Sequence, residues 1–402
     1  MIFVVSEFYY PEETSTGYIV TKIAEGLVET FPVQVITCPP DYSGLKAAPD
    51  SEIRNRVKIE RIKTVSINKN KIVSRLIGSI LRSFKLAVKT IKMIKKGDTV
   101  FIVTNPALLL ILMCLVCRFT RSSLIILTHD VFPENLEAAK LLYGDSLLFR
   151  ILVRLFNLAY NSAEHIIVIG RDMKKIMMHK INSDNPEITV ITNWADTTDI
   201  YPDERNANKI IKDLHLEKCF VVQFAGNIGR VQGIEHIIMA AEILKSENIH
   251  FIFVGEGAKK KWLIEQVGSR QLTNVTVFNS MPRREQQFFL NACDVGIVSL
   301  ASGMTGLGVP SKTYNILAAG KPIIAIADSE SEVGLLIQED KVGWIVAPAD
   351  PEGLASAIRE ARGFSRLCEM GRRAREIAES KYSFKVIIAK YREILDRYES
   401  KH

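Results

Sequence analysis

Residues 308–322, GVPSKTYNILAAGKP, place a lysine at the start of a short segment that is otherwise small and apolar. Ser311 is a typical N-cap residue and Gly320 a typical helix stop, so we predict one short helix between them. Free N–H groups at its start, together with Lys312, can bind a phosphate. Asn315 follows one turn later on the same face, where it can hydrogen-bond a hydroxyl or an amide. Alternatively, Lys312 simply reaches solvent and Asn315 is a tolerated helix residue.

A second candidate for phosphate binding is FAGNIGRVQGIEHIIMAAEIL, residues 224–244. A strand-like run is followed by Gly226, Gly229 and Gly233, and then by a helix-like run. Glycines after a strand let a diphosphate approach backbone N–H groups, and Arg230 adds a fixed positive charge. The alternative is a flexible turn with a solvated arginine.

Three further stretches carry weaker signals. Gly17 stands where a loop turns into a helix in PEETSTGYIVTKIAEGL, residues 11–27, and Glu256 lies between two glycines in FIFVGEGAKKKWL, residues 251–263. Each fits a phosphate or nucleoside contact, and each also fits an ordinary turn. His129 and Asp130 end the apolar run LIILTH, where a general base or a sugar contact would be placed. A satisfied structural histidine is the alternative.

These residues need a scaffold, and the chain supplies two series of strand-like runs. We expect strands at 2–6, 33–38, 99–104, 124–129, 165–170 and 188–193, then at 220–226, 250–257, 275–280, 294–300, 322–327 and 343–348. Helix-period segments alternate with them. Apolar strands alternating with helices are typical of parallel sheets covered on both faces. We therefore predict an α/β fold with two doubly wound Rossmann-like domains facing each other across a ligand cleft.

The polar stretch 193–209 marks the join between the two series. It separates an N-terminal, acceptor-side domain of residues 1–196 from a nucleotide-sugar-binding domain of residues 197–382. We expect the C-terminal helix, residues 383–402, to pack back onto the first domain.

The composition is that of a globular protein, with 402 residues, 47% hydrophobic and 24% charged. Six scattered cysteines suit reduced thiols in a cytosolic protein. Neither a D-x-D motif nor a convincing His/Cys cluster suggests a metal, and the N-terminus resembles a first strand more than a signal peptide. The uncharged window 99–117 is split by Asn105-Pro106 into a strand and a helix too short to cross a bilayer.

The net charge of +7 is concentrated in one segment. From Arg61 to Gly97 there are eleven Lys or Arg and no Asp or Glu. Within residues 69–96, apolar side chains recur every three or four positions beside a row of cations, which predicts an amphipathic helix. We expect this helix to dock on an anionic membrane surface, because no aromatic residues interleave the cations as in nucleic-acid binding. A packed helix with a solvated charged face is the alternative.

Taken together, the stretches resemble glycosyltransferase family 4, retaining nucleotide-sugar transferases of the GT-B fold, and within it the bacterial O-antigen, capsule and exopolysaccharide branch. The matching stretches, from residue 8 to about 325, are FYYPEETSTGYIVTKIAEGL, LTHDVFPENL, EHIIVIGRDMKKIM, ITVITNWADTTDIYP, FAGNIGRVQGIEHIIMAA, FIFVGEGAKKKWL and GVPSKTYNILAAGKPIIA.

The resemblance implies roles for individual residues. Arg230 and Lys312 would neutralise the leaving diphosphate, and His129 and Asp130 would face the transferred sugar or the acceptor hydroxyl. The residues implied in donor binding are Gly17, Gly226, Asn227, Gly229, Glu256, Met281, Thr305, Gly306, Leu307, Gly308 and Asn315. No cofactor and no metal are implied, since the nucleotide-sugar is a substrate.

The sequence departs from the family pattern at four positions. Two glutamates common in the family fall on Thr305 and Asn315, and an arginine and a lysine fall on Asn227 and Gln232. Positive charge is supplied instead by Arg230 and Lys312. This difference concerns mainly the donor-sugar contacts.

The resemblance and the basic segment together predict a hexosyl or N-acetylhexosaminyl transferase. It would move a sugar from a nucleotide-sugar, with UDP favoured over GDP, to a polyprenyl-diphosphate-linked saccharide in cell-surface polysaccharide biosynthesis. We expect a cytoplasmic protein bound peripherally to the inner face of the membrane, without a nucleic-acid partner. The alternatives are a GT-B enzyme with a soluble acceptor, an epimerase, and a non-catalytic GT-B scaffold.

Overall fold

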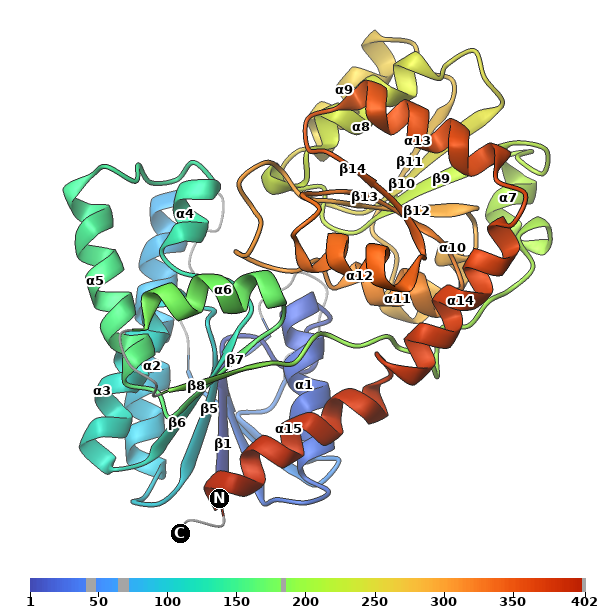
Figure 1. Cartoon of the computed structure of the whole chain (residues 1–402). Helices are drawn as coiled ribbons and strands as arrows, with labels where there is room; N and C mark the ends of the chain where they lie inside the picture. Colours follow the sequence, from blue (N-terminus) through green and yellow to red (C-terminus); the bar gives the residue numbers. More distant parts are fainter. Residues whose placement is uncertain (41–47, 64–71, 182–185, 400–402) are drawn as a thin grey trace. The chain divides into compact units, whose positions relative to one another are not determined.

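The structure is a computed structural model that describes residues 1–40, 48–63, 72–181 and 186–399. The chain forms two compact units (Figure 1). Unit 1 comprises Met1–Thr192 together with the chain from Ile388 onward, and unit 2 comprises Asn193–Ile387.

Unit 1 is built on an eight-stranded sheet in the order β3-β4-β2-β1-β5-β6-β7-β8. All neighbouring strands are parallel except β3, which pairs antiparallel with β4. Their bounds are β1 Ile2–Ser6, β2 Val33–Thr37, β3 Ser51–Arg54, β4 Val57–Arg61, β5 Thr99–Val103, β6 Ser123–Thr128, β7 His165–Val168 and β8 Glu187–Val190. The order of the strands along the sheet reverses at β1, which lies between β2 and β5.

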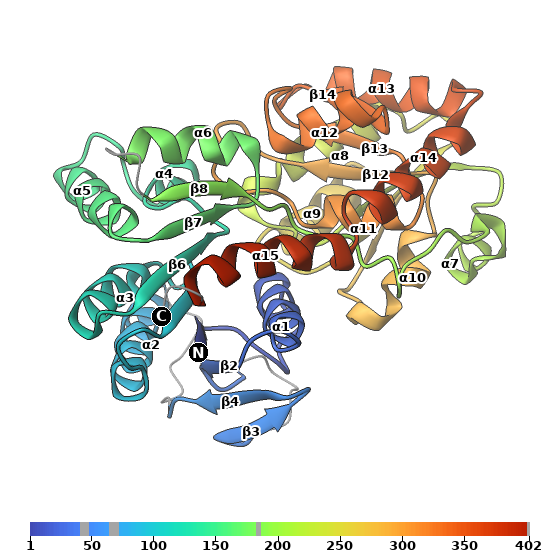
Figure 2. The same cartoon turned by 60° about the horizontal axis from the view of Figure 1, so that its bottom comes forward.

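The helices of unit 1 are α1 Ser15–Leu27, α2 Ile72–Met93, α3 Ala107–Thr120, α4 Glu134–Ala138, α5 Leu147–Asn161, α6 Arg171–Lys180 and the C-terminal part of α15, Phe384–Glu399. Helices α2, α3 and α5 lie side by side (Figures 1 and 2). The predicted helix over 69–96 is thus observed as α2, and residues 69–71 lie outside the described residues. In the described part of the chain, no helix is both long enough and apolar enough to cross a bilayer.

The hairpin β3–β4 was absent from the predicted strands. Only one face of β4 is apolar, with Val57 and Ile59 buried, and Ile53 of β3 is exposed. Asn55 and Arg56 form the turn with positive φ angles of 46° and 66°. Short charged edge strands with a turn lacking glycine give a weak pattern in the sequence.

Unit 2 contains a six-stranded parallel sheet in the order β11-β10-β9-β12-β13-β14. The strands are β9 Phe220–Ala225, β10 Ile249–Val254, β11 Val275–Phe278, β12 Val295–Ser299, β13 Ile323–Ile326 and β14 Gly343–Val346. The helices are η1 Arg205–Ala207, α7 Lys209–Asp213, η2 Arg230–Gln232, α8 Ile234–Ile243, α9 Lys260–Ser269, η3 Arg283–Glu285, α10 Gln286–Leu290, α11 Lys312–Ala318, α12 Glu332–Asp340, α13 Pro351–Gly363 and α14 Leu367–Ser380. Its topology switches between β9 and β12.

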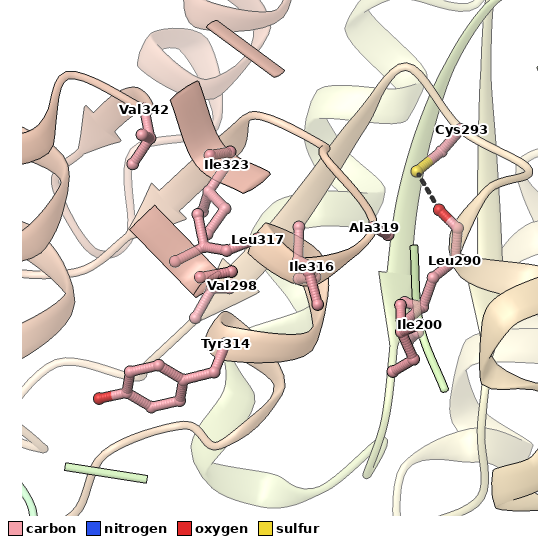
Figure 3. Packing of buried hydrophobic residues seen from close by; sticks show 14 of the residues in the cluster. Ile200, Leu290, Cys293, Val298, Tyr314, Ile316, Leu317, Ala319, Ile323 and Val342 are labelled. Atoms are coloured by element: carbon pink, nitrogen blue, oxygen red, sulfur yellow. Dashed lines mark hydrogen bonds between the residues drawn. The ribbon is translucent and has the colours of Figure 1, made fainter. Parts of the chain in front are cut away.

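Helix α11 is held firmly in the core of unit 2. Every residue from Thr313 to Ala318 is buried. Tyr314, Ile316 and Leu317 belong to one apolar cluster with Val298 of β12 and Ile323 of β13 (Figure 3). A short helix packed on all sides fixes the direction of the lysine at its first position.

Helix α15 begins in unit 2 and continues into unit 1. Its Tyr391 is 1% exposed and lies edge-on against Phe101 of β5, with ring centroids 6.1 Å apart. Arg392 donates to the Gly26 carbonyl of α1 at 2.6 Å. The last helix of the chain therefore completes the core of the first unit.

Candidate functional site

The glycine loop after β9 packs against the loop after β10. Gly226 has φ 137° and donates its N–H to the Val254 carbonyl at 2.8 Å, and Ile228 donates to the Glu256 carbonyl at 2.8 Å. A Cβ on Gly255 would lie 1.9 Å from the Gly226 carbonyl oxygen. The glycines are therefore required for close approach of two backbones at the carboxyl end of the sheet.

Lys312 reaches this loop from the start of α11. Its Nζ lies 3.5 Å from the centroid of the Phe224 ring, and a Cβ on Gly226 would be 3.6 Å from it. The amino group is buried and has no hydrogen-bond partner among the described residues. Burial lowers the pKa of Lys312 from 10.5 to about 7. A buried amine with three unused hydrogen-bond positions is costly without a ligand, and an anion would satisfy it.

Arg230 is exposed and has no hydrogen-bond or ion-pair partner within the described ranges. Its neighbours attach the loop to the end of β12: Val231 accepts from the Ala301 N–H at 2.9 Å, and the Gln232 carbonyl accepts from the Ser299 hydroxyl at 2.6 Å. The loop thus crosses the topological switch between β9 and β12. Ligands of open α/β sheets bind at this kind of position.

The segment between β12 and α11 is anchored from both sides. Met304 and Leu307 are buried, Gly306 has φ 75°, and Thr305 donates its hydroxyl to the Asp328 carboxylate. Gly308 follows, close to the start of α11. Thr305 is therefore engaged inside the unit.

Asn315 is 7% exposed, and its amide is used within unit 2. Its oxygen accepts from the Asp196 N–H at 3.1 Å, and its nitrogen donates to the Gln286 side chain at 3.2 Å. Asn315 therefore connects the polar stretch 193–209 to α11 through a hydrogen bond. Ser311 occupies the predicted N-cap position of α11, but it has helical conformation and makes no side-chain capping bond.

The remaining predicted donor residues of unit 2 have local partners. Glu256 pairs with Lys260, whose amino group also contacts the Asn279 side-chain oxygen. Met281 packs against the apolar cluster beneath α11. The Asn227 side chain lies against Gly229, where an added Cβ would be 2.9 Å from the Asn227 amide nitrogen.

In unit 1, His129 and Asp130 follow β6. The Asp130 N–H donates to Thr104 Oγ1 at 3.2 Å, and Asn135 of α4 donates to Asp130 Oδ1 at 2.9 Å. Burial raises the pKa of Asp130 from 3.8 to about 6, against a lowering effect of the Asn135 hydrogen bond. Burial lowers the pKa of His129 to about 4, so the ring is neutral at physiological pH. A partly desolvated carboxylate such as that of Asp130 can accept a proton.

Gly17 lies in the first turn of α1. Its N–H donates to Thr14 Oγ1 at 3.2 Å, and a Cβ there would be 2.7 Å from the Glu12 carbonyl oxygen. This amide is therefore already capped by the chain itself.

Three supporting residues escaped the sequence analysis: Phe224 under Lys312, and Thr104 and Asn135 around Asp130. Phe224 and Thr104 lie at or just after strand ends, which was the available signal, whereas Asn135 lies in α4. A surface pocket lined by residues such as Met1, Phe31 and Lys58 lies at the amino ends of the strands, away from the expected ligand edge. The described residues contain no group of three or more His, Cys, Asp or Glu placed to hold a metal ion.

The fold and the glycine loop define the class: two Rossmann-like units of the GT-B type. Solved structures share this fold. Sucrose-phosphate synthase from Thermosynechococcus elongatus has a TM-score of 0.79 at 15% identity, covering 100% of this chain and 99% of that chain. Anabaena Alr3699/HepE, solved with UDP and glucose, has a TM-score of 0.73 at 15% identity, covering 98% and 99%.

Sequence relatives define the family. Residues 206–376 match the family described as "Glycosyl transferases group 1". "Probable glycosyltransferase WbjE" of Pseudomonas aeruginosa is 37% identical over 97% of this chain and 96% of its own length. "Putative colanic acid biosynthesis glycosyl transferase WcaI" of Escherichia coli K12 is 32% identical over 35% of each chain. The chain belongs to the group 1 glycosyl transferases, glycosyltransferase family 4, which confirms the family and fold predicted from the sequence.

Proposed function

We propose that the protein transfers a hexosyl or N-acetylhexosaminyl group from a UDP-sugar to a polyprenyl-diphosphate-linked saccharide, in the assembly of a cell-surface polysaccharide. The observation that carries this proposal is the buried Lys312 amino group beside Gly226, which has no hydrogen-bond partner in the described parts of the chain. The names of the relatives, one in colanic acid biosynthesis, favour a polysaccharide product. The UDP and glucose bound to HepE favour a UDP-sugar donor.

The mechanism follows from where charge develops. As the bond between sugar and phosphate breaks, the sugar becomes oxocarbenium-like and negative charge grows on the departing diphosphate. A protonated Lys312 and the exposed Arg230 stabilise that charge more than they stabilise the ground state. Both cations belong to the protein, so we propose a metal-independent reaction.

We further propose that the anomeric configuration is retained, as the family resemblance implies. The acceptor hydroxyl then loses its proton either to a leaving phosphate oxygen or to Asp130. For the acceptor, the support is the basic segment 69–96, whose described helix α2 carries no acidic residue and suits an anionic membrane surface.

The test is a thermal-shift series with UDP, GDP, ADP, CMP and dTDP on wild type and Lys312→Met. A nucleotide at about 100 times its Kd adds about 2.7 kcal/mol to the free energy of unfolding. We expect wild type to be stabilised most by UDP. Lys312→Met keeps the bulk against Phe224 but lacks the cation, so it should lose that shift.

Lys261→Met, at an exposed lysine of α9, is the matched control and should keep the UDP shift. Absence of a shift with every nucleotide would favour the non-catalytic scaffold. A UDP shift that survives in Lys312→Met would remove Lys312 from the diphosphate site.

A further inference from the structure

In its described part, helix α2 exposes several large apolar side chains to solvent. Its buried side is narrow and includes Leu86, Ala87 and Thr90. Ile80 is exposed among the described side chains, as is a row formed by Ile77, Leu81, Phe84, Val88 and Ile91. Their spacing of alternating four and three residues forms one stripe along the helix. A helix whose only task was to cover the sheet would carry this stripe on its buried side.

Helix α5 has the same unusual arrangement. Phe149 and Phe156 face the interior, while Leu147, Ile151, Leu155 and Leu158 form a second exposed stripe. Leu147 is 74% exposed and Leu158 is 68% exposed, so both side chains lie mostly in water.

Helix α3 packs against both α2 and α5 and adds Leu115 and Phe119, the latter 80% exposed (Figure 2). We call the exposed apolar side chains of α2, α3 and α5 the apolar helix face. Single exposed hydrophobic residues are ordinary, but exposed apolar side chains on three neighbouring helices mark an interaction surface.

The charged residues of these helices all have the same sign. They carry eight Lys or Arg and no Asp or Glu. Arg82 pairs with Glu7, and Lys89 pairs with Glu60. Lys92, Arg118, Arg150 and Arg154 have no ion-pair partner among the residues that the structure describes.

We propose that the apolar helix face inserts into the interfacial region of a bilayer containing anionic lipids, with α3 and α5 contributing as much as α2. Apolar side chains enter the acyl boundary while the cations reach the headgroups. A second copy fits this surface less well, because a two-fold interface would set the unpaired cations of one copy against those of the other. The inference rests on the proposed function and replaces its single docking segment with three helices.

The experiment is flotation of the full chain with vesicles of phosphatidylcholine containing 30% phosphatidylglycerol, at about 0.1 M and about 0.5 M NaCl. We expect wild type to bind at both salt concentrations, because insertion of apolar groups is not screened. The double change Leu147→Ser and Leu158→Ser on α5 should lower the partition constant at least tenfold at high salt. Arg150→Gln with Arg154→Gln should lower binding mainly at low salt.

Ile264→Ser on α9 of unit 2 removes another exposed apolar side chain and should leave flotation unchanged. Full binding by the α5 serine variant would overturn the three-helix surface. Failure of wild type to float, together with a dimer in sedimentation that the α5 serine variant converts to monomer, would assign the face to a second copy.

The UDP thermal shift is measured on the same variants. Serine variants that keep the UDP shift but lose flotation separate the lipid surface from the nucleotide site. Flotation by a wild type that binds no nucleotide would support the surface and contradict the proposed transferase.

Discussion

Lys312 combines two properties that oppose each other in the ligand-free protein. Its amino group is close to the aromatic face of Phe224, which favours a cation, but it is shielded from water, which favours the neutral amine. A bound diphosphate reverses the balance, because it supplies the missing hydrogen bonds and the opposite charge.

Binding of UDP should therefore take up a proton above neutral pH. Burial lowers the pKa of Lys312 to about 7 in the folded protein, whereas in the unfolded chain its pKa is 10.5. Between these values the folded state binds fewer protons, so the contribution of Lys312 to unfolding free energy rises with pH. UDP affinity should fall correspondingly from pH 7 to pH 9.

Calorimetric titration at pH 8.5 in buffers of different ionisation enthalpy measures this proton uptake directly. Close to one proton should be taken up by wild type and substantially fewer by Lys312→Met. Equal uptake by the two proteins would assign the proton to another group.

Asp130→Asn should stabilise unit 1 at pH 7.5. Burial raises the pKa of the wild-type carboxyl from 3.8 in the unfolded chain to about 6 in the folded protein. Its contribution to stability therefore falls as the pH rises between these two values. The amide removes the buried charge and still accepts the Asn135 hydrogen bond. We expect a gain of about 1–3 kcal/mol at pH 7.5, from roughly 1.4 kcal/mol per pKa unit.

Denaturant unfolding at pH 7.5 and pH 4 measures the difference. The gain should shrink towards zero at pH 4, where the wild-type carboxyl is largely protonated in the folded protein. A gain of equal size at both values would show that the charge of Asp130 is not its source.

At the scale of elements, the site depends on close contact between the loops after β9 and β10, which Gly226 and Gly255 allow. Gly255→Ala would place a methyl group 1.9 Å from the Gly226 carbonyl oxygen, so the two loops must separate. We expect a loss of about 1–3 kcal/mol in the stability of unit 2, together with loss of the UDP shift.

Gly268→Ala is the control within the same unit. It lies in α9, and nothing comes within 4 Å of an added Cβ there. This variant should gain up to about 1 kcal/mol and bind UDP normally. Chemical denaturation followed by Trp fluorescence compares the two, and equal stabilities would mean that the strand ends accommodate a side chain.

The order of helices and apolar strands could be predicted from the sequence because buried parallel strands are nearly continuous apolar runs. The residues around Lys312 and Gly226 were also accessible, since glycines and a cation at element ends form a local pattern. The partners of Asn315 were not, because Asp196 and Gln286 lie far away in sequence. The hairpin β3–β4 was also missed, because its buried face consists of alternate residues on one short strand.

The exposed stripe on α2 illustrates the same limit. Periodicity identified an amphipathic helix but could not say which of its faces meets the sheet. The narrow side with Ala87 and Thr90 packs inward because small residues allow close contact between helices. That choice depends on packing against α3, which the sequence of α2 does not describe.

At the scale of the whole molecule, unit 1 depends on a helix that follows unit 2 in the chain. Tyr391→Ala should therefore destabilise unit 1 by about 3–5 kcal/mol, since it leaves a cavity beside Phe101. Hydrogen exchange of β5 and β1 should report the loss, while the strands of unit 2 keep their protection. Lys390→Ala, on the exposed side of α15, is the control. Uniform loss of protection in both units would instead indicate that they unfold together.

This discontinuity also has a consequence for biosynthesis. A ribosome finishes every strand of unit 1 before it begins unit 2, yet the side chain that seals the first core, Tyr391, emerges after unit 2 is complete. The first-made half of the protein is thus the last to mature. During that interval the nascent chain already exposes the apolar and cationic side chains of α2, α3 and α5. We therefore expect it to need a chaperone, or its membrane, before translation ends.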